Sequence, residues 1–481
     1  MVRARIPVMV LLFSAAAAME AISLSSLSAI GNSDVWWHLS SGLWMLQNHA
    51  LPRTGIFSQA AGTAWIASSW IYDLLVAFSY RLVGLRAIPL LLMGFKTTLA
   101  VVTFLLAGGL RRNFWPAVAL SAVAQYVLGA LPPGPTYASV LFFGLELLLL
   151  FESRRRQRWQ LLLWLPALML LWANVDPQFV IGVAVLVLFL ASLWCEQYLF
   201  SGAHPVEVGK IATIACVAVL CTVVTPYFYH PYGVFFGVTF SSANAYLPDF
   251  HALGFRQPQD YVLLLLAMSA FLGLGLRRSR DLFSIALLAA SMAAAFYSQR
   301  NIWLVAMAAV AVMGQTLRVP VENETSNNII KRPEARNALV VSLIVVVIAA
   351  WAIMPRSREA LLARIGKSYP VGACDSIRQQ HLAQPLFNAY EWGGFVTWYL
   401  PQYPVAIDGR SDLYGADVIT EYSKMMNADV PYTEYAAVSG AQTILLPKRA
   451  IMAGALSSLP IFKVVYSDDL AVVLSRRSGD E

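Results

Sequence analysis

Long uninterrupted apolar runs recur from the N-terminus to about residue 355, and short polar segments separate them. A helix needs about 20 apolar residues to cross a bilayer core. Runs without alternation, such as Val180–Leu190, favour helices, because a membrane-spanning backbone must satisfy its hydrogen bonds within a helix or a closed barrel. The pattern predicts about 11 spans, at roughly residues 6–28, 87–110, 114–131, 136–151, 159–175, 178–200, 208–226, 260–276, 281–297, 301–318 and 338–355.

Beyond residue 355 the pattern changes to short strand-like and helix-like runs, which indicate a small α/β domain. Strands are expected over PLFNA, YPVAID, TILLP, FKVVYS and LAVVLS, and helices over EWGGFVTWYL, ADVITEYSKMM and KRAIMAGAL. The predicted fold class is therefore an α-helical polytopic membrane protein with a C-terminal α/β domain. The predicted domains are a transmembrane domain over residues 1–355, which includes a first outer loop at 29–86, and a soluble domain over residues 356–481.

Composition agrees with a membrane protein and adds little about partners. The chain is 58% hydrophobic and 13% charged, with a mean hydropathy of +0.61, whereas soluble proteins are about 25% charged. The net charge of +7 does not indicate a nucleic-acid partner, because the basic residues fall in short clusters between the apolar runs. The four cysteines show neither a metal-binding spacing nor a disulfide framework.

The segment 65–83 leaves two topologies open, since it reads either as a twelfth span or as an amphipathic helix at the membrane interface. If it lies flat, the inner loops carry basic clusters at 111–112, 154–158, 277–280 and 331–336, and the short outer loops carry only Arg53, Arg81, Arg86, Arg256 and Arg300. Positive residues favour the cytoplasmic side. The sequence thus favours 11 spans in the inner (cytoplasmic) membrane, with a cytoplasmic N-terminus and a periplasmic or extracellular C-terminal domain.

The first outer loop carries the first candidate group. Asp34 opens the predicted helix VWWHLSSGLWML, and His38 follows one turn later on the same face. A helix N-cap is the alternative explanation of Asp34. On the same outer side, Asp176 and Arg300 lie at the ends of spans, where a charge costs less than at the midplane.

The second candidate group lies in the tail between residues 388 and 415. Gly393 and Gly394 permit a tight strand-to-helix turn. Asp408 and Arg410 follow a predicted strand, where sites of α/β domains often form, although a local ion pair that fixes a loop is the alternative.

Three charged residues fall within predicted spans, where such residues are usually paired. They are Glu20, Lys96 and Glu146. We expect Glu20 to pair with Lys96, and Glu146 to reach the basic cluster at 154–158.

Several motifs resemble those of a large group of bacterial membrane proteins in the GT-C glycosyltransferase class. They are Asp34-Val35-Trp36-Trp37-His38-Leu39 with Gly42, Pro52-Arg53-Thr54, Trp70, Leu171-Trp172-Ala173-Asn174, Pro231-Tyr232-Gly233, Arg300-Asn301, Asn388, Tyr390-Glu391-Trp392-Gly393-Gly394, Ile407-Asp408-Gly409-Arg410 and Asp412-Leu413-Tyr414. The resemblance covers nearly the whole chain and implies a GT-C-like transmembrane domain.

The wider class includes oligosaccharyltransferase catalytic subunits and protein mannosyltransferases, which use polyprenyl-phosphate or polyprenyl-diphosphate sugar donors at the outer face. The resemblance implies that Asp34 is the essential acid of the first outer loop. It also implies an acceptor-holding region in the tail at Tyr390, Glu391, Trp392, Asp408 and Arg410. The chain departs from the class in the outer loop LPPGPTY, which has no acid, and in carrying Gly134 and Asp176 where the group has a basic residue and a histidine. Either Asp176 is a substitute carboxylate or the chain has lost activity.

These residues suggest a mechanism as a hypothesis. Asp34 would take the proton of an acceptor hydroxyl as the sugar carbon is attacked, and His38 would orient Asp34 or contact the donor phosphate. Arg300 would balance the charge of the leaving phosphate, or a Mg²⁺ or Mn²⁺ ion held by Asp34 and Asp176 would do so.

The expected partners are a polyprenyl-phosphate sugar donor, the bilayer, and a glycan, lipid or protein acceptor. Two alternative functions stay open. One is a non-catalytic role in handling lipid-linked glycan or in envelope assembly. The other is secondary transport, although the sequence shows no convincing internal repeat.

Overall fold

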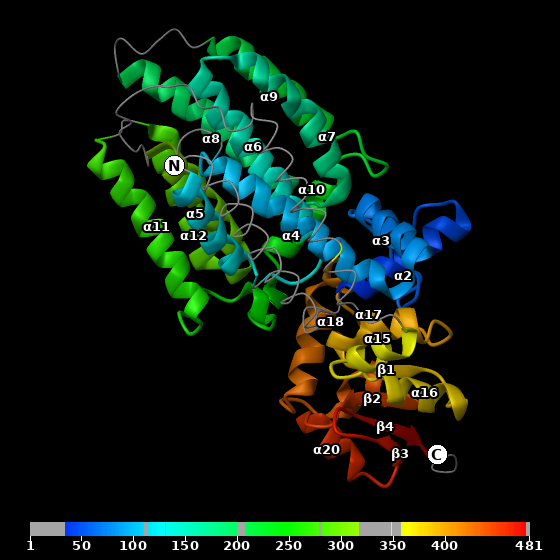
Figure 1. Ribbon diagram of the computed structural model, residues 1–481. Coiled ribbons are helices and arrows are strands. Elements are labelled where there is room, and N and C mark those ends of the chain that lie inside the picture. Colours follow the sequence, from blue (N-terminus) through cyan, green and yellow to red (C-terminus); the bar gives the residue numbers. More distant parts are fainter. Residues whose placement is uncertain are drawn as a thin grey trace. The chain divides into compact units, whose positions relative to one another are not determined.

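A computed structural model describes residues 34–109, 114–129, 131–199, 207–278, 281–316, 348 and 357–477 of the chain (Figure 1). The described part is mostly helical and contains one small sheet. The predicted spans 6–28 and 338–355 lie outside it except for residue 348, and so does Glu20 with its expected pairing to Lys96.

By packing, the chain divides into two compact units. Among the described residues, the first unit comprises 92–109, 114–129, 131–199, 207–232, 248–278, 281–316 and 348, and the second comprises 34–91, 233–247 and 357–477.

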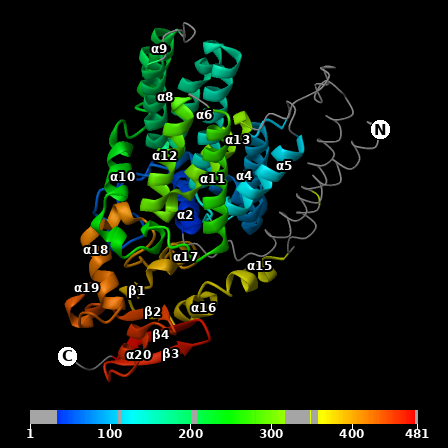
Figure 2. The same ribbon diagram turned by 90° about the vertical axis from the view of Figure 1, so that its left-hand side faces the viewer.

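The first unit is a bundle of apolar helices. Its elements are α4 (Ala87–Leu106, from Leu92), α5 (Phe114–Leu128), α6 (Thr136–Arg156), η3 (Trp159–Trp164), α7 (Leu165–Val175), α8 (Phe179–Leu199), α9 (Val208–Cys221), α11 (Pro258–Leu276), α12 (Leu282–Tyr297), η6 (Gln299–Asn301) and α13 (Ile302–Thr316). Helix α10 (His230–Thr239) begins in this unit and ends in the second. α13 lies among α5, α6, α11 and α12 (Figure 2). Every residue from 302 to 312 is therefore buried. A helix that is apolar all round is expected at such a central position.

Every predicted span within the described part of the chain overlaps with one of these helices. Four helical segments there are long and apolar enough to cross a membrane, namely Trp70–Leu106, Thr136–Arg156, Phe179–Leu199 and Pro258–Leu276. These segments agree with a multi-pass membrane protein, and the total of 11 spans stays a prediction.

The expected contact of Glu146 with the basic cluster at 154–158 is wrong. Glu146 is fully buried in α6, and a Cβ at Gly182 of α8 would lie 2.9 Å from its Oε2. Arg154 instead bonds to Glu196 (2.8 Å) and Asp281 (2.9 Å). The reason is helical geometry, because eight residues along a helix span about 12 Å.

The second unit contains two helices of the predicted first outer loop, α2 (Asp34–Asn48) and α3 (Trp70–Val83), followed by the short η2 (Gly84–Arg86). α3 buries Tyr72, Asp73, Val76 and Ala77 and exposes Leu75, Phe78 and Leu82. It ends at Gly84, whose φ of 64° favours glycine and whose N–H bonds to the carbonyl of Tyr80. Its apolar exposed face agrees with the predicted interfacial helix, which stays a prediction.

The tail contributes a mixed four-stranded sheet to this unit, in the order β1-β2-β4-β3. β1 (Leu386–Asn388) is parallel to β2 (Thr443–Pro447), and β4 (Ala471–Arg476) is antiparallel to both β2 and β3 (Phe462–Ser467). The helices of the tail are α15 (Arg358–Ile365), α16 (Val371–Gln379), α17 (Tyr390–Tyr399), α18 (Ser411–Met426), α19 (Ala436–Ser439) and α20 (Ile451–Ser457).

The first outer loop packs with the tail, whereas the sequence analysis assigned residues 29–86 to the transmembrane domain. α17 contacts α2, and Trp36 of α2 is fully buried against Tyr369, Phe395 and Trp398. Ser58 and Val405 form a parallel bridge between loop and tail. Burial of the Trp36 side chain and pairing of the backbones at Ser58 and Val405 account for the association of the loop with the tail.

Candidate functional site

Asp34 is the first helical residue of α2 and is half-buried. Its Oδ1 accepts a hydrogen bond of 3.3 Å from the indole Nε1 of Trp37, one turn later. The backbone of Gly409 from the tail lies directly against this carboxylate, because a Cβ at position 409 would overlap with Oδ1 of Asp34. Asp34, the predicted acid, therefore lies between its own helix and the tail segment that contains Gly409. Both segments carry motifs of the resemblance described above.

His38 lies on the next turn of α2 and is buried behind Asp34. Its Nδ1 is 2.5 Å from Oδ1 of Asp73 in α3, and the side chains are 2% and 0% exposed. The ring stacks on Trp37, with centroids 3.5 Å apart. A carboxylate bonded to one imidazole nitrogen fixes the orientation of the ring. His38 thus ties α2 to α3 and supports the indole that bonds to Asp34.

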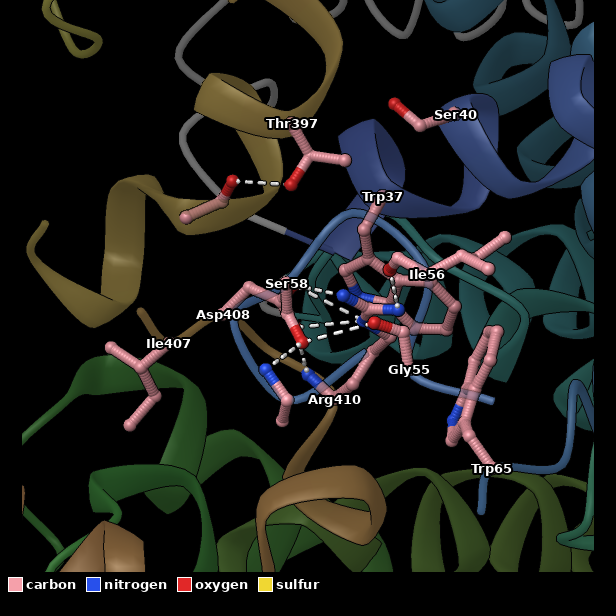
Figure 3. Close-up of polar contacts among 12 residues, drawn as sticks. Trp37, Ser40, Gly55, Ile56, Ser58, Trp65, Thr397, Ile407, Asp408 and Arg410 are labelled. Atoms are coloured by element: carbon pink, nitrogen blue, oxygen red, sulfur yellow. Dashed lines mark hydrogen bonds and ion pairs between the residues drawn. The ribbon is translucent and has the colours of Figure 1, made fainter. Parts of the chain in front are cut away.

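Asp408 and Arg410 form a buried bidentate ion pair (Figure 3). Arg410 donates from Nε to Oδ1 (3.0 Å) and from Nη2 to Oδ2 (2.6 Å), and its backbone N–H also bonds to Oδ1 (3.0 Å). Burial lowers the pKa of Arg410, but the charge and hydrogen bonds of Asp408, together with Tyr414 and Asp412, raise the pKa above its usual value. The local ion pair considered in the sequence analysis is therefore present.

The same arginine joins the tail to the first outer loop. Its Nη1 donates to the carbonyl of Ile56 at 2.9 Å, and its guanidinium lies over the ring of Trp65 at 5.0 Å (Figure 3). Trp65 in turn donates from Nε1 to Oδ2 of Asp412 at 3.1 Å. Two charged residues of the tail thus hold two positions of the loop.

The residues expected to hold an acceptor have structural contacts. Trp392 is 4% exposed, and its Nε1 donates to the carbonyl of Ser368 at 3.3 Å. The N–H of Tyr390 donates to the hydroxyl of Tyr422 at 2.8 Å, whereas Glu391 is exposed. Gly393 allows α17 to approach residues 407–408, because a Cβ there would overlap with the Ile407 carbonyl. Packing accounts for Trp392, and an acceptor contact by Tyr390 or Glu391 stays a prediction.

Asp176 belongs to the first unit, at the turn between α7 and α8. Its Oδ2 accepts a hydrogen bond from Ser139 Oγ (2.7 Å), and its Oδ1 accepts one from the N–H of Gln178 (3.2 Å). The side chain of Trp172 also donates to Ser139, at 2.7 Å. This buried network gives Asp176 a structural role in connecting α6 to the turn.

Arg300 also belongs to the first unit, in η6. Its guanidinium lies 5.0 Å from the centroid of the Phe250 ring, and the residue is half-buried. The structure therefore groups Asp34 and His38 with Asp408 and Arg410 in one unit, and groups Asp176 with Arg300 in the other.

Asp34 and Asp176, the two residues expected to hold a divalent metal, belong to different units. Within the described ranges no three side chains of His, Cys, Asp or Glu are grouped so that they could hold an ion. Asp176, the expected second ligand, already accepts a hydrogen bond at each carboxylate oxygen. Binding of Mg²⁺ or Mn²⁺ by Asp34 and Asp176 stays a prediction.

Sequence reasoning missed the partners of the candidate residues. Asp73 stands 35 positions from His38, and Trp65 stands 345 positions from Arg410, so no local spacing relates them. Gly409 lies within the motif Ile407-Asp408-Gly409-Arg410, but the motif does not indicate that this glycine contacts Asp34. Two signals were available: the single acid within the apolar stretch 65–83, and a glycine between two residues of opposite charge.

Three solved structures resemble this chain to different extents. The oligosaccharyltransferase AglB from Archaeoglobus fulgidus, in complex with an inhibitory peptide and a dolichol-phosphate, has a TM-score of 0.57 and 10% identity over 91% of this chain and 69% of its own. ArnT from Cupriavidus metallidurans, bound to undecaprenyl phosphate, has a TM-score of 0.48 and 14% identity over 98% of both chains. The Archaeoglobus fulgidus oligosaccharyltransferase tethered to an acceptor peptide has a TM-score of 0.49 and 10% identity, with coverage of 91% and 69%.

No protein-family model matches the sequence, and a search of curated proteins finds no match. At 10% identity, the likeness to AglB is one of fold. The chain is thus distantly similar in fold to an archaeal oligosaccharyltransferase, and at the level of the fold this confirms the distant similarity predicted from the motifs.

Proposed function

We propose that the protein is a GT-C-type glycosyltransferase that moves a sugar from a polyprenyl-phosphate-linked donor to an acceptor at the outer face of the membrane. The observation that carries the proposal is the Asp34 carboxylate, half-buried at the start of α2 between Trp37 and Gly409. The fold likeness to an oligosaccharyltransferase supports the same class of reaction. The 11-span topology, with the first outer loop and tail outside, is part of this proposal.

In the proposed reaction, Asp34 accepts the proton of an acceptor hydroxyl while the hydroxyl oxygen bonds to the sugar carbon. The bond from that carbon to the donor phosphate breaks, and the lipid phosphate leaves with the bonding electron pair. A positioned carboxylate contributes roughly 10²–10⁴-fold to such a step. Arg300 is the proposed cation for the leaving phosphate, since a guanidinium matches phosphate geometry.

His38 acts in this proposal by orienting Asp34 rather than by contacting phosphate. Its side chain is 2% exposed, with Nδ1 on Asp73 and its ring stacked on Trp37. His38 therefore affects the reaction through the indole of Trp37, which donates a hydrogen bond to Asp34.

The test is transfer of labelled sugar from polyprenyl-phosphate donors by purified protein, with a detergent extract of cell envelopes as the acceptor source. Asp34→Asn should lower the rate roughly 100-fold or more, because the amide cannot accept the proton. Asp469→Asn is the matched control, since Asp469 is exposed on the β3–β4 turn of the tail. Transfer by the Asp34→Asn protein at the wild-type rate would overturn the assignment.

A non-catalytic role in handling lipid-linked glycan is the second candidate. The outer loop 131–135 carries no acid, and Asp176 accepts hydrogen bonds at both oxygens. Wild-type protein that binds polyprenyl-phosphate but transfers no sugar from any donor would favour this role over catalysis.

A further inference from the structure

We propose that Gly409 in the tail is a positioning residue for the Asp34 carboxylate. This inference rests on the proposed function. It adds to the reaction site a part of the chain that is more than 350 residues away from Asp34 in the sequence. The tail then forms one wall of the reaction site, in addition to any contact with an acceptor.

The first observation is steric. A Cβ at position 409 would overlap with Oδ1 of Asp34, and it would lie 3.3 Å from Nε1 of Trp37 and 3.5 Å from Cγ of Asp34. The space in which the carboxylate meets its indole donor therefore exists because residue 409 has no side chain. Gly409 is not among the residues with positive φ, so the backbone itself does not require glycine here.

The second observation is that the backbone on both sides of Gly409 is fixed. Asp408 accepts three hydrogen bonds from the side chain of Arg410 and one from its backbone N–H. Arg410 also bonds to the carbonyl of Ile56, and Trp65 packs on its guanidinium. Trp65 also contacts Trp37 edge-on, with ring centroids 5.9 Å apart (Figure 3). The same residues therefore support the indole that donates a hydrogen bond to Asp34.

The chemical consequence follows from the hydrogen bond between Trp37 and Asp34. A donor to a carboxylate favours the charged form, which is the form that can accept a proton. A side chain at position 409 would push the carboxylate from the indole N–H, so the ionised form would lose this support. Misplacement of a reacting group by about 1 Å can cost roughly 100-fold in rate.

Gly409→Ala tests the inference, and Gly454→Ala is its matched control. Nothing lies within 4 Å of a Cβ at Gly454, on α20 of the same tail. In the sugar-transfer assay, Gly409→Ala should lower kcat roughly 10- to 100-fold, with little change in KM for the donor. The acidic limb of its pH–rate profile should move to higher pH. Gly454→Ala should match the wild type in all three.

Trp37→Phe is a second variant that leaves the tail unchanged. It removes the indole N–H, so its acidic limb should move in the same direction as that of Gly409→Ala, whereas Trp44→Phe on the same helix should leave the limb in place. Wild-type kcat and an unmoved limb in the Gly409→Ala protein would overturn the inference. A lower kcat without movement of the limb would also overturn it, because that result indicates a structural role.

A readout without turnover separates this inference from the proposed function. In protein labelled with ¹⁵N at the indole nitrogens, the Trp37 resonance is identified by its loss in Trp37→Phe. It should shift in Gly409→Ala and stay in place in Gly454→Ala, even if the wild-type protein transfers no sugar. An unshifted resonance in Gly409→Ala would overturn the positioning role, whatever the enzymatic assay shows.

Discussion

Arg410 is a cation with almost no contact with solvent, since its side chain is 1% exposed and that of Asp408 is fully buried. Such a charge is stable only while its partner remains, because an unpaired buried ion loses its hydration without compensation. A second aspartate–arginine pair in the tail, between Asp375 and Arg378, differs in this respect. Its side chains are 39% and 43% exposed, so water can replace a lost partner.

Asp408→Asn should therefore destabilise the second unit by about 3 kcal/mol, because the amide keeps the shape but leaves the guanidinium of Arg410 without a counter-charge. Asp375→Asn should cost about 1 kcal/mol or less. Hydrogen exchange of β2 and β4 amides measures both, since about 1.4 kcal/mol corresponds to a tenfold change in protection. Equal protection in the two variants would contradict the expectation that the buried ion pair contributes more to stability than the exposed one.

Sequence patterns identified single residues of this site but not what they touch. The four-residue spacing of Asp34 and His38 gave their shared helical face correctly, because that relation is local. The contact of His38 with Asp73 depends on how two helices cross, and the contact of Arg410 with Ile56 depends on how the loop meets the tail. Neither contact follows from a periodic pattern in the sequence.

The helices α2 and α3 approach each other at Gly42. A Cβ at this position would overlap with the backbone carbonyl of Asp73 and would lie 2.8 Å from Cβ of Ala77. The missing side chain therefore lets α3 come close enough for Asp73 to reach His38. The crossing of two elements depends here on one glycine.

Gly42→Ala should separate α2 from α3 and weaken the His38–Asp73 bond, at a cost of about 1–3 kcal/mol. The measurement is the thermal unfolding midpoint of purified protein, together with hydrogen exchange of residues 34–48. Gly62→Ala in the same loop is the control, because nothing lies within 4 Å of a Cβ there. A Gly42→Ala protein as stable as Gly62→Ala would show that the helices do not need this close approach.

Elements with their own periodicity were predictable, and one that depends on a distant partner was not. TILLP and FKVVYS are strands as expected, and EWGGFVTWYL lies within α17 except for its last residue. YPVAID was expected to be a strand of the tail sheet, but Val405 pairs with residues 57–59 of the first loop instead. The pattern of alternation gave its extended backbone, whereas its hydrogen-bonding partner lies about 350 residues away in the sequence.

At the scale of the molecule, the second unit combines two segments that the sequence predicts as parts of different domains. Trp36, Ser58 and Arg410 each join the first outer loop to the tail. Segments that pack together must lie on the same side of a membrane. The packing thus agrees with the topology inferred from basic residues, in which both segments are outside.

Cysteine accessibility in intact cells tests this topology. Lys463→Cys places a thiol on an exposed position of β3, and Arg156→Cys places one at the last residue of α6, where the arginine side chain is 52% exposed. A membrane-impermeant maleimide should label Lys463→Cys in intact spheroplasts, because the tail is expected outside. It should label Arg156→Cys only after the membrane is permeabilised, because the basic cluster at 154–158 is expected inside. Wild-type protein gives the background from the native cysteines. If 65–83 crosses the membrane as a twelfth span, every basic cluster from Arg111 onward faces outward. Arg156→Cys would then be labelled from outside, and that result would exclude the 11-span topology.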